Sequence, residues 1–157
     1  MKCSYFYILI LICGIVACNT TDSSKVNNFY PSRTHSVISS SGGKVLLQPY
    51  TAPDSNAQKE FIYFHLSLVP PQHFVVPTDK AASFYIDFDI QKHMQLLQGT
   101  DTLYPVICQR VTTLQAKQYE YEVIFDRMQN GMAVFKLLDE QLGIGNASIT
   151  LTETELN

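Results

Sequence analysis

The stretch EFIYFHLSLV, Glu60–Val69, decides the fold class of this chain. Its side chains alternate with a period of two, which is the repeat of a β-strand. The face predicted to point into a core carries Ile62, Phe64, Leu66 and Leu68. The opposite face carries Phe61, Tyr63, His65 and Ser67, so apolar residues lie on both faces. Such a strand is expected either to lie centrally in a sandwich or to be covered by a partner.

Six further stretches carry strand patterns and are separated by Pro, Gly or Asn residues that favour turns. They are Lys44–Tyr50, Ser83–Ile90, Leu103–Leu114, Tyr119–Phe125, Gly131–Leu138 and Ala147–Leu151. About seven short strands at this spacing are typical of an antiparallel sandwich or barrel.

Two of these stretches and one further segment allow sharper predictions. In Ser83–Ile90 the alternation predicts that Phe84, Ile86, Phe88 and Ile90 point inward. Pro105 lacks a backbone donor, which indicates that its strand starts there or lies at a sheet edge. Ile90–Leu97 is the one segment with a helical pattern, and it fits a short helix or a strand equally well.

The N-terminus carries an export pattern. Lys2 supplies a positive charge, and the apolar run Tyr5–Val16 is long enough for a signal peptide but too short to span a bilayer. The following residues, Ile15-Val16-Ala17-Cys18, resemble the lipobox of bacterial lipoprotein signals. The resemblance implies a signal peptide over residues 1–17 and diacylglycerol, then a further acyl chain such as palmitate, on Cys18. The alternatives are an ordinary secretory signal or an uncleaved membrane anchor.

Residues 18–43 are rich in Ser, Thr, Asn and Gly, which predicts a flexible tether between the lipidated Cys18 and a β-sandwich domain over residues 44–157. The pair Phe29-Tyr30 could dock on that domain. By resemblance to enterobacterial sorting, Asn19 after the lipidated cysteine implies the outer membrane.

Net charge and cysteine content restrict the classes of function and of site that this chain is expected to have. The formal net charge is −3 and no basic stripe is present, so no nucleic-acid partner is expected. Of the four cysteines, Cys3 and Cys13 would leave with the signal and Cys18 would become a thioether. Cys108, in an apolar context, would then be the one thiol left, and we expect it to be buried and inert.

The C-terminal half contains a layout that resembles immunoglobulin-like domains of exported bacterial lipoproteins. A strand ends in Ile124-Phe125-Asp126, a turn follows at Gln129-Asn130-Gly131, and Phe135–Asp139 and Ile149–Leu151 provide later strands. Residues 89–105 are similar to small uncharacterised lipoproteins of the Bacteroidota. The resemblance implies an immunoglobulin-like antiparallel β-sandwich and an envelope location, without the paired Cys and core Trp of antibody domains, and it implies no catalytic residue.

Candidate chemical groups are sparse. The four histidines, His35, His65, His73 and His93, lack the spacing of metal ligands, although His65 and His73 flank a turn and could face each other. Asp87 and Asp89 share a predicted strand face, with Asp101 nearby, and a solvated face explains them better than a Ca²⁺ or acid–base site. Asp101-Thr102-Leu103 resembles a short acceptor motif for O-linked glycans, which would place a glycan on Thr102.

These observations favour a lipid-anchored envelope lipoprotein with a non-catalytic role in binding or assembling another envelope protein. No catalytic residue, metal or cofactor is expected. The alternative is a glycan- or peptide-binding module that uses exposed aromatic side chains. An enzyme is the third possibility.

Overall fold

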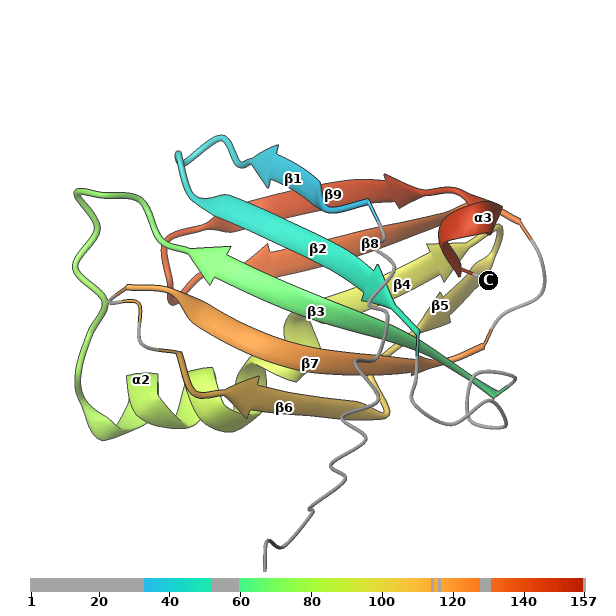
Figure 1. The fold of residues 1–157 in the computed structure, drawn as a ribbon. Helices are drawn as coiled ribbons and strands as arrows, with labels where there is room; N and C mark the ends of the chain where they lie inside the picture. Colours follow the sequence, from blue (N-terminus) through green and yellow to red (C-terminus); the bar gives the residue numbers. More distant parts are fainter. Residues whose placement is uncertain (1–32, 52–59, 114, 116, 128–130, 157) are drawn as a thin grey trace, which may run out of the picture.

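The structure is a computed structural model that describes residues 33–51, 60–113, 115, 117–127 and 131–156. Two antiparallel sheets pack face to face, and a short helical segment lies at one end of them (Figure 1). The predicted signal peptide 1–17, Cys18, Asn19 and the pair Phe29-Tyr30 lie outside the described residues.

The five-stranded sheet has the order β1-β2-β3-β7-β6. Its strands are β1 (His35–Ile38), β2 (Lys44–Tyr50), β3 (Phe61–Val69), β7 (Tyr119–Asp126) and β6 (Ile107–Val111). The four-stranded sheet has the order β5-β4-β8-β9. Its strands are β5 (Asp101–Leu103), β4 (Met94–Gln98), β8 (Ala133–Asp139) and β9 (Gly145–Leu151). All neighbouring strands are antiparallel.

This strand order confirms the predicted immunoglobulin-like sandwich. Strands β2, β3, β7 and β6 occupy the positions of A, B, E and D in one sheet, and β9, β8, β4 and β5 those of G, F, C and C′ in the other. Strand β1 is an additional edge strand beside β2. The five predicted strands that correspond to β2, β3, β7, β8 and β9 are confirmed.

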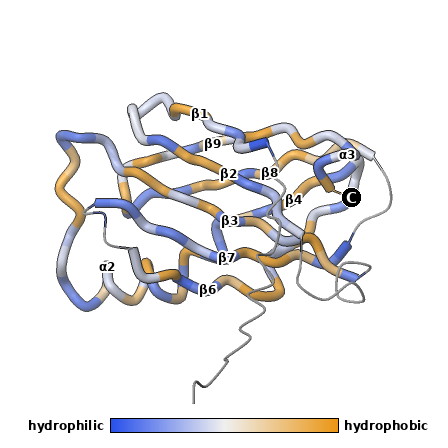
Figure 2. The backbone as a smooth tube through the Cα atoms, in the orientation of Figure 1, coloured by the Kyte–Doolittle hydropathy of each residue, from blue (hydrophilic) through white to orange (hydrophobic). Residues whose placement is uncertain are grey.

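The core lies between the two sheets and is built on aromatic side chains. Phe64 of β3 and Phe125 of β7 meet at a ring-centroid distance of 5.9 Å, and both rings contact Phe135 of β8 at 6.5 and 6.4 Å. None of the three is exposed to solvent. In Figure 2 hydrophobic and hydrophilic segments alternate along the strands, as expected when one face of each strand is buried.

The predicted strand Ser83–Ile90 is wrong, because this region is helical. Helix α2 (Lys80–Phe84) continues into a π-helical turn, η1 (Tyr85–Asp89), and a 3₁₀ turn, η2 (Ile90–His93). The side chain of Asp79 caps the start by accepting a hydrogen bond of 2.8 Å from the Ala82 amide.

The apolar residues of this segment also fit a helical repeat, which is why their alternation is misleading. The buried ones are Ala82, Tyr85, Ile86 and Ile90. Phe84 and Phe88, predicted to point inward, are instead 55% and 58% exposed, and their rings contact each other at 5.2 Å. A helix suffices here because the segment only bridges β3 in one sheet and β4 in the other.

Two other predicted boundaries change. The stretch Leu103–Leu114 is divided between β5 and β6, which belong to different sheets, and Pro105 lies in the connection between them. Both of these strands are sheet edges, as Pro105 indicated. Ile90–Leu97, left open between helix and strand, contains both η2 and the start of β4.

Strand β1 lies within residues 18–43, which the sequence assigned to a flexible tether. It pairs with β2 from His35 to Ile38, and Val37 packs against the core. The folded domain therefore begins before Lys44. The polar residues around this strand concealed it, because only Val37 and Ile38 interrupt a Ser-rich composition.

The buried carboxylate of Asp139 organises the turn between β8 and β9. It accepts hydrogen bonds from the amides of Gln141, Leu142 and Ile144 at 2.9 to 3.2 Å and from the Tyr85 hydroxyl at 2.9 Å. Burial, and then the adjacent carboxylate of Asp139, raise the pKa of Tyr85 well above its ordinary value. Asp139 thus ties the turn to the helical segment.

Glycine is required at one position of the same turn. Gly143 has φ +70°, and a Cβ atom there would lie 2.4 Å from the ring of Phe74. The left-handed backbone and the close approach of the ring both exclude a larger side chain.

The C-terminal helix α3 (Glu153–Leu156) connects the two ends of the described chain. Glu155 accepts hydrogen bonds of 2.8 Å from the amide and the hydroxyl of Thr152, and the bond from the amide is one half of a capping box. His35 of β1 contacts the other carboxylate oxygen at 2.8 Å. Burial acts to raise the pKa of Glu155, but the Thr152 hydrogen bonds and the nearby His35 outweigh it and lower this pKa.

We expect Glu155→Gln to lower the free energy of unfolding at pH 7 by about 1–2 kcal/mol. Because the pKa of Glu155 is lower in the folded state, its contribution is present above the unfolded-state pKa and is lost as the pH falls through the folded-state value. The unfolding free energies of the wild type and the variant, measured by urea denaturation, should therefore converge as the pH falls below the lowered pKa of Glu155. Glu153→Gln, an exposed neighbour, is the control; an equal effect of both substitutions would contradict this account.

Candidate functional site

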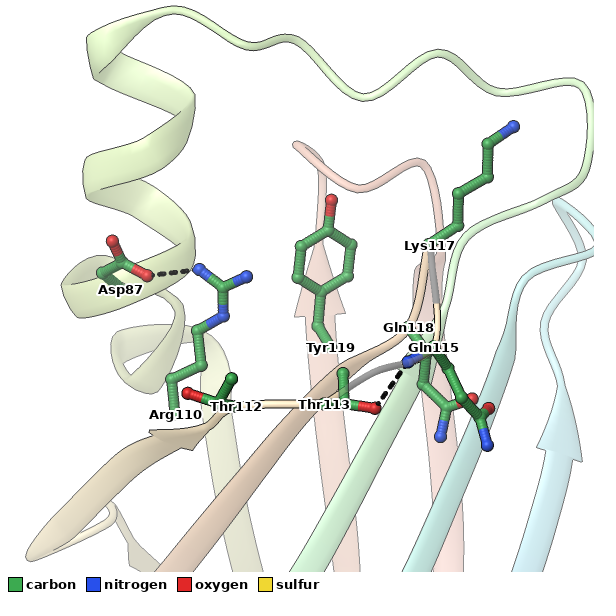
Figure 3. Close-up of a pocket in the computed structure, with 8 residues that line it drawn as sticks. All are labelled: Asp87, Arg110, Thr112, Thr113, Gln115, Lys117, Gln118 and Tyr119. Carbon is green, nitrogen blue, oxygen red and sulfur yellow. Dashed lines mark hydrogen bonds and ion pairs between the residues drawn. The ribbon is translucent and has the colours of Figure 1, made fainter.

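A polar cleft of about 560 Å³ lies between the helical segment and the start of β7 (Figure 3). Its lining residues come from η1, β6, the β6–β7 connection and β7, and they are Asp87, Arg110, Thr112, Thr113, Gln115, Lys117, Gln118 and Tyr119. This volume is in the range of small-molecule sites. The cleft is lined by charged, amide and hydroxyl groups around one aromatic ring.

Arg110 is held from two sides. Its Nη1 atom donates to Asp87 Oδ1 at 2.6 Å, and its guanidinium carbon lies 5.3 Å from the centre of the Tyr119 ring, a cation–π distance. Figure 3 shows Lys117 on the other side of that ring. The order of the side chains across the cleft is therefore carboxylate, guanidinium, phenol and ammonium.

The β6–β7 connection supplies the neutral groups of the cleft. Thr113 Oγ1 accepts from the Gln115 amide at 3.1 Å, and Gln118 Nε2 donates to Glu120 at 2.7 Å. Lys117 has φ +62°, a left-handed conformation that is uncommon outside glycine. Within the described part of the chain, the Lys117 ammonium has no hydrogen bond or ion pair.

A second surface lies on the outer face of the five-stranded sheet. One cross-strand row of apolar and aromatic side chains runs through Tyr50, Tyr63, Ile124 and Ile107. The next row is polar and contains Gln48, His65, Glu122 and Gln109. Burial, then Glu122 and Tyr63, raise the pKa of Tyr50 to about 12, so its hydroxyl stays neutral.

The apolar row ends at the edge strand β6. Ile107 is 50% exposed and the preceding Val106 is 47% exposed, although the Val106 amide donates to Ile124 at 2.8 Å. Strand β6 pairs with β7 on one side only. We call Val106, Ile107, Ile124 and Tyr63 the β6 surface.

The acidic residues singled out from the sequence do not form one cluster. Asp87 and Asp89 lie on η1 and not on a strand face. Asp87 pairs with Arg110, and Asp89 pairs with Lys92 at 2.5 Å. Asp101 and Thr102 are exposed on the edge strand β5.

The histidines are also separated. His65 lies 3.8 Å from Glu120 on the neighbouring strand, His35 contacts Glu155, and the ring of His93 lies 5.4 Å from that of Tyr85. Among the described residues, no group of three His, Cys, Asp or Glu side chains is placed to hold a metal ion.

Cys108 lies on the inner face of β6 opposite Val123 and is partly buried against the core. Burial raises the pKa of its thiol to about 12, so it is protonated and a poor nucleophile at neutral pH. The thiol is therefore partly buried where the sequence predicted a buried one, and its raised pKa is consistent with the predicted lack of reactivity. No helix within the described ranges is long and apolar enough to cross a membrane.

Comparisons with models of protein families found no match, and comparisons with curated proteins and with solved structures found no significant one. The geometry of this chain is thus the basis for the functional argument. Sequence reasoning missed the cleft, because its residues are distributed over one helical turn, two strands and a polar loop. Arg110 and Lys117 were the available signal, since both cations precede Tyr119 in one short segment.

Proposed function

We propose that this protein is a lipid-anchored lipoprotein of the bacterial envelope, held at the outer membrane by acyl chains on Cys18, and that its sandwich binds another envelope protein without catalysing a reaction. The anchor follows from Ile15-Val16-Ala17-Cys18 and the apolar run before it. Two or more acyl chains make membrane attachment stable.

The observation that carries the binding role is the apolar row that ends at an unpaired strand edge. An edge strand presents backbone donors and acceptors that another strand can bind. The exposed Val106 and Ile107 offer apolar contacts beside them. The partner that fits this surface is an extended segment of another protein, with apolar side chains at alternate positions, that pairs with β6.

A tether would favour such a weak contact. Attachment to the same membrane raises the effective concentration of the partner, so a single added strand suffices for association.

The anchor is tested by Cys18→Ser. We expect loss of labelled palmitate and release of the protein from the membrane fraction, because the thioether can no longer form. Cys108→Ala is the matched control and should remain labelled and membrane-bound. Retention of the label in Cys18→Ser would refute the lipoprotein assignment.

The β6 surface is tested by photo-crosslinking in intact cells. A benzophenone side chain at Ile107 should yield a specific adduct, whereas the same probe at Met132, which is 70% exposed, should not. Val106→Asp should abolish the Ile107 adduct while leaving the circular dichroism spectrum unchanged. Hydrogen exchange should show protection of β6 amides in the isolated complex. An equal adduct from both positions, or none from Ile107, would rule out docking at this edge.

A further inference from the structure

We infer that the cleft between η1 and the β6–β7 connection is a binding site for an acidic sugar, a hydroxylated ring that carries one carboxylate. This site is distinct from the β6 surface. Arg110 pairs with the inward-facing Tyr121, whereas Ile107 pairs with the outward-facing Ile124, so the two surfaces lie on opposite faces of the sheet. The inference does not depend on protein docking at β6.

The charges of the cleft favour a single negative charge on the ligand. Its lining contains two cations, Arg110 and Lys117, and one anion, Asp87. Arg110 is already paired with Asp87, whereas the ammonium of Lys117 has no partner among the residues described. A ligand carboxylate beside Lys117 would be neutralised there, on the far side of the Tyr119 ring from Asp87.

The remaining groups favour hydroxyls over a simple anion. Asp87 accepts and Arg110 donates, and such an adjacent pair can bind neighbouring ring hydroxyls, each of which both donates and accepts. Thr112 and the side chain of Gln115 add groups of both kinds. A doubly charged phosphate would exceed the one unpaired cation of the lining, and an acetate-sized anion would contact few of the lining groups.

The Arg110 side of the cleft is positioned before a ligand arrives. The contacts of Arg110 to Asp87 and to the Tyr119 ring fix its guanidinium, so little side-chain freedom is lost on binding. The Tyr119 ring provides an apolar surface for the C–H groups of a sugar. In Figure 1 the helical segment, which contributes Asp87 to the cleft, lies at the opposite end of the sandwich from α3.

The test uses the detergent-solubilised full-length protein and saturation-transfer difference NMR, which observes the protons of the sugar. The probes are D-glucuronate and N-acetylneuraminate, with D-glucose as the neutral comparison and acetate and inorganic phosphate as anions without a sugar ring. We expect saturable binding of at least one acid at millimolar concentration, about tenfold weaker binding of glucose, and weakening by salt. Acetate and phosphate should not displace the acid at equal concentration.

Two variants separate the roles of the charges. Lys117→Gln should weaken binding of the acid about tenfold and leave glucose binding unchanged, whereas Asp87→Asn should weaken both sugars. Lys44→Gln, at an exposed position on β2, is the matched control. Absence of saturable binding by both acids overturns the inference. Equal competition by acetate or phosphate, or an equal effect of Lys44→Gln, overturns it as well.

Discussion

Asp139→Ala is expected to lower the free energy of unfolding by about 3–5 kcal/mol. The carboxylate is 1% exposed and accepts hydrogen bonds from three backbone amides and one tyrosine hydroxyl. Alanine would leave the amides of Leu142 and Ile144 buried without an acceptor, and each unsatisfied buried donor costs about 1–3 kcal/mol. The midpoint of urea denaturation should fall accordingly, with an unchanged slope.

Three further variants locate the source of this effect. Tyr85→Phe removes one of the hydrogen bonds and should cost about 1 kcal/mol. Asp139→Asn keeps one acceptor oxygen and should fall between Tyr85→Phe and Asp139→Ala. Asp126→Ala changes an exposed aspartate of β7 and should cost less than about 0.5 kcal/mol. If Asp139→Ala were no worse than Asp126→Ala, the turn would not depend on its carboxylate.

Phe135→Ala is expected to lower the free energy of unfolding by about 3–5 kcal/mol, because it empties the space between the two sheets. Phe135 is completely buried and contacts Phe64 and Phe125, which belong to the opposite sheet. The rings cannot close over the gap without moving a sheet, so most of the cavity should persist.

Phe88→Ala is the matched control with the same chemical change. Phe88 is 58% exposed on η1 and loses mainly its contact with Phe84, so the cost should stay below about 1 kcal/mol. Chemical denaturation of the two variants separates core from surface. Similar costs would place Phe88 in the core, as the alternating pattern of Ser83–Ile90 had predicted.

The strands were predictable wherever one face is buried and the other is accessible to solvent. In β3 the alternation matches burial except at Ser67, which is buried although it lies on the outer face. In β7 the alternate residues Tyr121, Val123 and Phe125 are buried. The pairing order of the strands came from the resemblance and not from alternation, since the same strands could have formed a barrel.

The helical segment shows why alternation alone is insufficient. Residues Tyr85, Ile86 and Ile90 are apolar at positions that satisfy a helix as well as a strand. The deciding signal was local: Asp79 stands three residues before the amide that it caps. A capping residue is a stronger signal for a helix than an ambiguous hydrophobic period, because it marks the residue at which the helix begins.

The functional groups were less predictable than the fold. In the sequence, Asp139 is indistinguishable from other polar residues at the end of a strand. Its importance arises because residues 141–144 turn so that their backbone amides donate to its carboxylate. Arg110 and Asp87 are 23 residues apart and meet only because η1 packs beside β6. Neither contact follows from a local pattern.

The contact between His35 and Glu155 has a kinetic consequence. These residues are 120 positions apart, and β3 pairs with β7 only after the chain has passed through β4, β5 and β6. Folds dominated by such distant pairings close slowly, on the scale of milliseconds to seconds, because long loops must form before their contacts stabilise them. Strand β1 can contact α3 only once that helix is available, so a nascent or partly refolded chain lacks the His35–Glu155 contact until residues 153–156 are in place.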